Sequence, residues 1–142
     1  MKLLIFAGSL RVDSCNKKFA REALRLVQEA GIDAELVDLK DYHMPVYDGD
    51  LETASGIPEF TVKLGKKIAS ADALIISTPE YNGGIPGILK NVVDWLSREK
   101  PVLLLINICC YWPRRPARWV VSAVCGIRAS RLKRSACMCF LE

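Results

Sequence analysis

Residues 2–16 have the sequence KLLIFAGSLRVDSCN, and they indicate how the fold begins. The apolar run Lys2 to Ala7 is too short for a helix and stops at a Gly-Ser pair, so it predicts a buried strand. A polar loop follows to about residue 16. From there to residue 30, apolar residues recur at the i, i+3, i+4 and i+7 positions of a helix, and Gly31 is a stop signal. The stretch therefore predicts one strand and one crossover helix.

The same alternation continues to about residue 107. Further strands are predicted at residues 33–39, 73–78 and 102–107, and further helices at residues 58–70 and 86–98, with a long Pro-, Gly- and Asp-rich loop over residues 42–58. Strands that alternate with crossover helices favour a parallel sheet covered on both faces. We therefore expect an α/β fold of the flavodoxin-like class, with strand order 2-1-3-4 and a ligand at the carboxyl ends of strands one and three.

Composition limits the class of protein but hides a break in the chain. The 142 residues carry a net charge of +4, which suits one soluble domain and excludes a collagenous or disordered chain. No apolar stretch is long enough to span a bilayer and no signal peptide fits, so we expect a cytoplasmic protein. Residues 1–101 carry −2 and residues 102–142 carry +6, and five of the six cysteines lie in the second part. The two parts need separate interpretations.

The loop after the first strand has the composition of a phosphate site. Backbone N–H groups at a helix N-terminus, the guanidinium of Arg11, and donors from Ser9, Ser14 and Asn16 could all face a phosphate monoester. The loop matches neither G-x-G-x-x-G nor a Walker motif. The alternative is that Ser14 or Asp13 only caps the helix.

The loop after the third strand has the sequence TPEYNGGIPG over residues 78–87. Asn82 and the glycines after it permit positive φ and close approach to a flat ligand, and Tyr81 offers an aromatic face. The alternative is an ordinary tight turn with an exposed tyrosine.

Together, the motifs G-S-L-R-x-x-S-x-N and P-E-Y-N-G-G-I-P-G-x-L-K-N-x-x-D-W resemble the NADPH-dependent FMN reductase family over residues 1 to about 106. The resemblance implies FMN as cofactor and NADPH as co-substrate. It assigns the FMN phosphate to the first loop and the isoalloxazine edge and ribityl chain to the second. The cofactor-binding residues it implies are Ser9, Arg11, Ser14, Asn16, Pro79, Glu80, Tyr81, Asn82 and Gly83.

The resemblance also implies an activity and an assembly. NADPH would pass a hydride to FMN, and the reduced flavin would pass electrons to a small-molecule acceptor such as a quinone, chromate, an azo compound or free flavin. No catalytic side chain and no metal site is predicted. The helix with Lys90, Asn91, Asp94 and Trp95 matches one that helps form a subunit interface in the family, so a homodimer or homotetramer is expected. The alternatives are a non-enzymatic FMN-binding electron carrier and an inactive truncated fragment.

Residues 107–142 form a basic, cysteine-bearing tail that departs from the family pattern. The family's third cofactor loop, last helix and fifth strand are not found there, so residues 1–106 are interpreted as an incomplete FMN-binding domain. Three hypotheses address the tail. The cysteine spacing disfavours zinc. An arginine cluster near two tryptophans would suit nucleic acid, but no recognised binding module accompanies it, so a nucleic-acid partner is not expected. A shifted frame of residues 112–119 permits Gly-Pro-Gly-Ala-Leu-Pro-Gly-Gly, which points to out-of-frame translation.

Overall fold

The described part of the computed structural model, residues 1–99, is built on three parallel strands. They are β1 (Lys2–Ala7), β2 (Asp33–Val37) and β3 (Ala73–Ser77), in the order β2-β1-β3. Leu4 pairs with Glu35 on one side and with Leu74 on the other. The expected order 2-1-3 of the first three strands is confirmed. The fourth strand, predicted at residues 102–107, lies outside the described residues.

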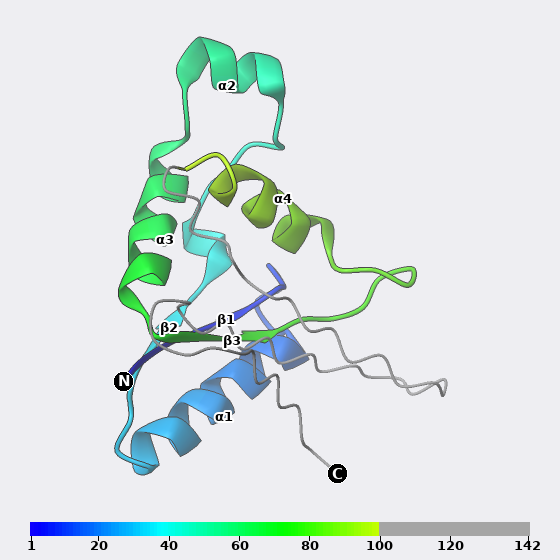
Figure 1. Cartoon of the computed structure of the whole chain (residues 1–142). Coiled ribbons are helices and arrows are strands. Elements are labelled where there is room, and N and C mark those ends of the chain that lie inside the picture. Colours follow the sequence, from blue (N-terminus) through cyan, green and yellow to red (C-terminus); the bar gives the residue numbers. More distant parts are fainter. Residues whose placement is uncertain (100–142) are drawn as a thin grey trace.

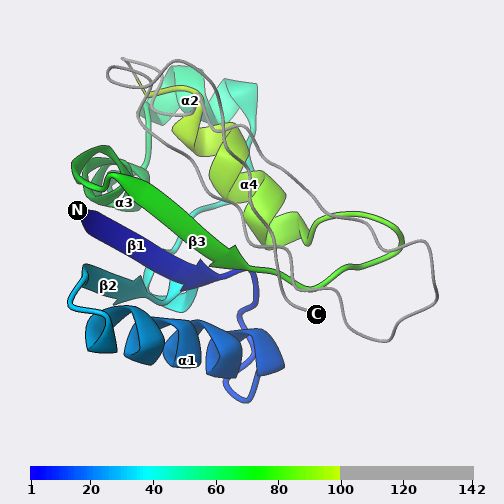
Figure 2. The same ribbon diagram turned by 60° about the horizontal axis from the view of Figure 1, so that its bottom comes forward.

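The helices divide between the two faces of the sheet (Figure 1, Figure 2). Helix α1 (Cys15–Glu29) covers one face, and α3 (Glu59–Ser70) and α4 (Gly87–Leu96) cover the other. The larger core cluster lies beneath α3 and α4 and includes Leu4, Leu64 and Val92, while Ala20 of α1 packs with Ile5 on the opposite face. Across residues 1–99, no helix has the length and apolar character needed to cross a membrane.

The segment between β2 and α3 is more regular than the sequence predicts. Strand β2 ends at Val37, and a short 3-10 helix, η1 (Leu39–Asp41), takes the place of the last predicted strand residues. The predicted loop 42–58 contains α2 (Gly49–Ser55), which Asp48 caps by accepting a hydrogen bond from the N–H of Asp50 at 2.8 Å. Helix α2 has no apolar period in the sequence because none of its residues is buried. Its helix is supported by a cap and first-turn acids instead of an apolar stripe.

Candidate functional site

The two loops singled out in the sequence begin side by side, because β1 and β3 are neighbours and end at the same edge of the sheet (Figure 2). The N–H of Gly8 donates to the carbonyl oxygen of Ser77 at 2.8 Å. A Cβ atom on Gly8 would lie only 2.7 Å from Oγ1 of Thr78, which is closer than real Cβ atoms come. Residue 8 must therefore be glycine for the two strand ends to approach this closely.

The N-terminus of α1 leaves its donors available. Its first internal hydrogen bond runs from the N–H of Lys18 to the carbonyl oxygen of Ser14 at 3.1 Å, so the N–H groups of residues 15–17 have no partner within the helix. Ser14 occupies the N-cap position, but its side chain makes no capping hydrogen bond, and no acidic residue lies in the first turn. The alternative that Ser14 or Asp13 serves only as a side-chain cap is not supported. This helix end is suited to an anion.

The four residues predicted to contact a phosphate occupy different depths of this loop. Ser9 and Ser14 are buried, Asn16 is half-buried and Arg11 is exposed. The hydroxyl of Ser77 donates to Oδ1 of Asn16 at 2.9 Å, which ties the first turn of α1 to the end of β3. With Oδ1 engaged, the Nδ2 group of Asn16 is left as a donor. The loop thus combines fixed donors near the backbone with an exposed guanidinium at its rim.

The second loop forms a tight turn. Tyr81 and Gly84 exchange backbone hydrogen bonds of 2.9 and 3.0 Å, and the residues between them, Asn82 and Gly83, both have positive φ, at 51° and 78°. The carboxylate of Glu80 accepts from the N–H of Gly83 at 2.9 Å. Pro79 is half-buried and Tyr81 is 55% exposed. The predicted positive φ is confirmed, and the loop presents an aromatic face and exposed backbone on a hydrogen-bonded turn.

Two residues at the base of this site, Ser77 and Thr78, were not among the predicted cofactor-binding residues. Both are buried, and they contact Asn16 and Gly8 of the other loop. The signal available in the sequence was their position, because polar residues at the carboxyl end of a buried strand face the ligand edge of a parallel sheet. Within residues 1–99, no hydrogen bond or ion pair joins the exposed residues 80–83 to the first loop, and the bonded contacts between the loops lie at their bases.

The motif residues Asn91 and Trp95 on α4 hold the segment that follows η1. The carbonyl oxygen of Pro45 accepts from Nδ2 of Asn91 and Nε1 of Trp95, both at 2.8 Å, and the N–H of Tyr47 donates to Oδ1 of Asn91 at 2.8 Å. Trp95 is fully buried. The Tyr47 ring meets the Trp95 ring edge-on, with centroids 5.1 Å apart. These two motif residues therefore have a clear role inside one chain.

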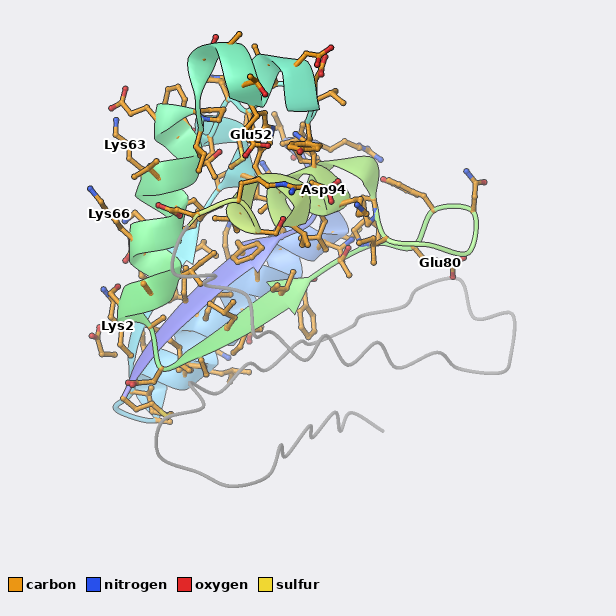
Figure 3. The ribbon with its side chains drawn as sticks, turned by 45° about the horizontal axis from the view of Figure 1, so that its top comes forward. Lys2, Glu52, Lys63, Lys66, Glu80 and Asp94 are labelled. Carbon is orange, nitrogen blue, oxygen red and sulfur yellow. The ribbon has the colours of Figure 1, made fainter. Side chains whose placement is uncertain are left out.

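Tyr47 also contacts two charged side chains, Glu52 and Arg98. Its hydroxyl donates to Glu52 at 2.9 Å, and the guanidinium of Arg98 lies 4.7 Å from the centre of the Tyr47 ring. The hydrogen bond to Glu52, together with burial, raises the pKa of Tyr47. Figure 3 shows Lys63 and Lys66 projecting from α3 on the side away from Glu80. The phenol stays neutral at ordinary pH.

On the α1 face, Lys17 and Asp38 form an ion pair with Nζ 2.6 Å from Oδ2. Burial opposes ionisation of the Asp38 carboxyl, but hydrogen bonds from Lys17 and from the N–H of Lys40 outweigh it and lower the pKa of Asp38.

The only histidine, His43, packs edge-on against Phe60 with ring centroids 6.0 Å apart. Within residues 1–99, no three His, Cys, Asp or Glu side chains gather in a way that could hold a metal ion.

Known proteins resemble this chain along most of its length. It is 41% identical over 98 residues to a 2-hydroxy-1,4-benzoquinone reductase of a Burkholderia species, covering 69% of this chain and 51% of that protein. It is 35% identical over 131 residues to an NAD(P)H-dependent FMN reductase of Pseudomonas aeruginosa, covering 92% of this chain and 62% of that protein. The chain thus spans about half to three fifths of the length of these curated relatives.

The fold is also found in solved structures. The flavoenzyme FerB of Paracoccus denitrificans, an NAD(P)H:(acceptor) oxidoreductase, is 33% identical, with a TM-score of 0.57 over 70% of this chain and 52% of its own. The sequence pattern of the family described as NADPH-dependent FMN reductase matches residues 1–134, which extends past residue 106 into the basic tail. With the flavodoxin-like sheet and the two joined loops in place, the chain belongs to the NADPH-dependent FMN reductase family.

Proposed function

We propose that this chain binds FMN and acts as an NAD(P)H oxidoreductase that passes electrons to a small-molecule acceptor of the quinone type. The observation that carries the proposal is the junction of the two loops, where Gly8 and Asn16 of the first are bonded to Ser77 at the base of the second. A phosphate donor set and a turn for a flat ring are thereby held at one edge of the sheet. Relatives named as quinone and FMN reductases support the activity.

The residues present suit FMN. The N–H groups of the first turn of α1, which have no partner within the helix, and Nδ2 of Asn16 would donate to the phosphate, with the guanidinium of Arg11 balancing its charge. The hydroxyls of Ser9 and Ser14 are close enough in sequence to add donors. The backbone of the turn at residues 79–83 would face the isoalloxazine edge, where a side chain larger than that of glycine would keep the ring away at residue 83.

The protein's part in the reaction is binding and orientation. Bound FMN supplies the chemistry, which is the acceptance of a hydride and its delivery as electrons to a second substrate. The helix end stabilises the phosphate charge without a reorganisation of side chains, because its N–H groups are fixed by the helix. The Gly83 N–H bond to Glu80 keeps the turn rigid, so the ring edge would meet a fixed surface. No side chain of the site is asked to transfer a proton.

Three further parts of the proposal come from the sequence. We take residues 1–106 as the FMN-binding unit and residues 107–142 as a separate basic tail. We also take the working form as a homo-oligomer in the cytoplasm, with the homodimer or homotetramer of the family as the first expectation. NADPH is the preferred donor in this proposal.

The test uses the full chain, purified and mixed with FMN or with riboflavin, which lacks the phosphate. We expect FMN to bind at least tenfold more tightly than riboflavin and the FMN form to oxidise NADPH when 1,4-benzoquinone is added. Binding without direct NADPH oxidation would favour the electron carrier over the enzyme. Equal affinity for FMN and riboflavin would refute the assigned phosphate loop. Size-exclusion chromatography with light scattering tests the oligomeric state.

A further inference from the structure

Lys17 is the third residue of α1, and its side chain is buried where a lysine is usually exposed. Only 8% of the side chain is accessible. A lysine in the first turn also opposes the helix dipole, whose positive end lies there. Helix propensity and dipole therefore give no reason for this lysine, and its position must be explained by what it contacts.

Its contact is a carboxylate that is itself held in place. Oδ2 of Asp38 binds Nζ of Lys17 at 2.6 Å, while Oδ1 accepts from the N–H of Lys40 at 2.9 Å, so both oxygens are engaged. Asp38 is the N-cap of η1, whose first residue, Leu39, is 1% exposed in the main core. The ion pair thus links the first turn of α1 to a point fixed by the core at the end of β2.

Packing alone does not hold Lys17. A small cavity of about 40 Å³ lies beside the pair, lined by Ala7, Lys17, Ala20, Arg21, Leu36, Val37 and Asp38. Because part of the space around the lysine stem is unfilled, apolar neighbours do not define a single position for it. The polar contact with Asp38 therefore decides where the stem, and the turn that carries it, must lie.

The Lys17–Asp38 pair adds a second contact to the hydrogen bond that the neighbouring residue, Asn16, makes with Ser77. Asn16 connects the same turn to β3 through Ser77, and Lys17 connects it to the end of β2 through Asp38. Two ties that reach two different strands fix the direction in which the free N–H groups of residues 15–17 point, whereas one tie would let the turn pivot.

We propose that the Lys17–Asp38 pair is a positioning device that sets the first turn of α1 in the geometry that selects a phosphate monoester. This inference rests on the proposed FMN site. Lys17 does not touch the ligand in this proposal; it acts through the backbone of residues 15–17. A simple charge effect would behave differently, because loss of the lysine and loss of the aspartate would then change anion affinity in opposite directions.

The experiment measures the affinities of the full chain for FMN and for riboflavin in four variants. Lys17→Met keeps the stem and removes the charge, Asp38→Ala removes the anchor, and Lys17→Arg is the conservative exchange. Arg25→Met is the matched control, because Arg25 pairs with Glu22 and Glu29 on the exposed face of the same helix. Amide exchange of Lys18, whose N–H closes the first turn, gives a measure that needs no ligand.

We expect Lys17→Met and Asp38→Ala each to raise the Kd for FMN about tenfold, to leave the Kd for riboflavin within about twofold, and to speed exchange at Lys18. Lys17→Arg should restore most of the affinity, and Arg25→Met should match the parent protein. Tighter FMN binding in Asp38→Ala, or an equal loss for FMN and riboflavin, would overturn the inference. If the parent protein binds no FMN, the proposed function fails, and unchanged exchange at Lys18 separately refutes the positioning role.

Discussion

The close approach of Gly8 to Thr78 predicts a large effect from one added methyl group. In Gly8→Ala, the new Cβ would lie 2.7 Å from Oγ1 and 3.1 Å from Cβ of Thr78, with Leu89 Cδ2 at 3.5 Å. One of the atoms must move by at least 0.3 Å to reach the 3.0 Å below which such contacts essentially never occur. Neither partner moves freely, because the N–H of Gly8 is bonded to Ser77 and Thr78 is buried with its hydroxyl donating to the carbonyl of Pro79 at 3.1 Å.

Overpacking of this kind costs about 1–3 kcal/mol in the free energy of unfolding. In urea denaturation followed by far-UV circular dichroism, we expect the midpoint of Gly8→Ala to fall by roughly 0.5–1.5 M, given ordinary slopes for small proteins. FMN affinity should fall as well, since the two loops are joined at this contact. Gly87→Ala is the matched control, because nothing lies within 4 Å of its added Cβ and its φ is not positive.

Relief by a second substitution identifies the cause. Thr78→Ala removes the Oγ1 atom that lies nearest to the new methyl group, so the double variant Gly8→Ala/Thr78→Ala should lose less stability than the two single effects added together. Thr78→Val keeps the bulk at the same position and should give no relief. A Gly8→Ala variant as stable as Gly87→Ala, or strictly additive effects with Thr78→Ala, would refute the steric explanation.

Three other predictions concern separate parts of the molecule. Arg11→Gln should weaken FMN binding about tenfold, through the loss of a charge-assisted phosphate contact, with no change for riboflavin, and fluorescence titration of both ligands would check this. Trp95→Phe should cost about 1–3 kcal/mol in urea denaturation, through the lost bond to Pro45 and the space left at a fully buried site, and a variant as stable as the parent would contradict both contributions. Asp38 has a lowered pKa in the folded chain, so its contribution is present above its ordinary pKa near 3.8 and is lost as the pH falls below that value. Urea midpoints from pH 6 to 3 should therefore drop less in Asp38→Ala than in the parent protein, and equal drops would contradict the pairing.

Local pattern was enough for the elements that bury an apolar face. The run KLLIFA became β1, the stripe through Ala20 became α1, and Leu64 and Ile68 mark the buried side of α3, because burial imposes a period on the sequence that survives without any knowledge of neighbours. The short helix α2 could not be predicted, because none of its residues is buried and its sequence therefore has no apolar period. Positive φ at Asn82 and Gly83 could also be predicted, because it depends on residue type within four positions.

The succession of β1, β2 and β3 with α1, α3 and α4, and the turn chemistry of the two candidate loops, could be predicted, since each depends on residues close together in the chain. The residues that join those loops are known from the tertiary structure alone. The contacts of Asn16 with Ser77, of Lys17 with Asp38 and of Asn91 with Pro45 link positions between 21 and 61 residues apart. Such contacts follow from how strands pair and helices pack, and a single sequence carries no local mark of them.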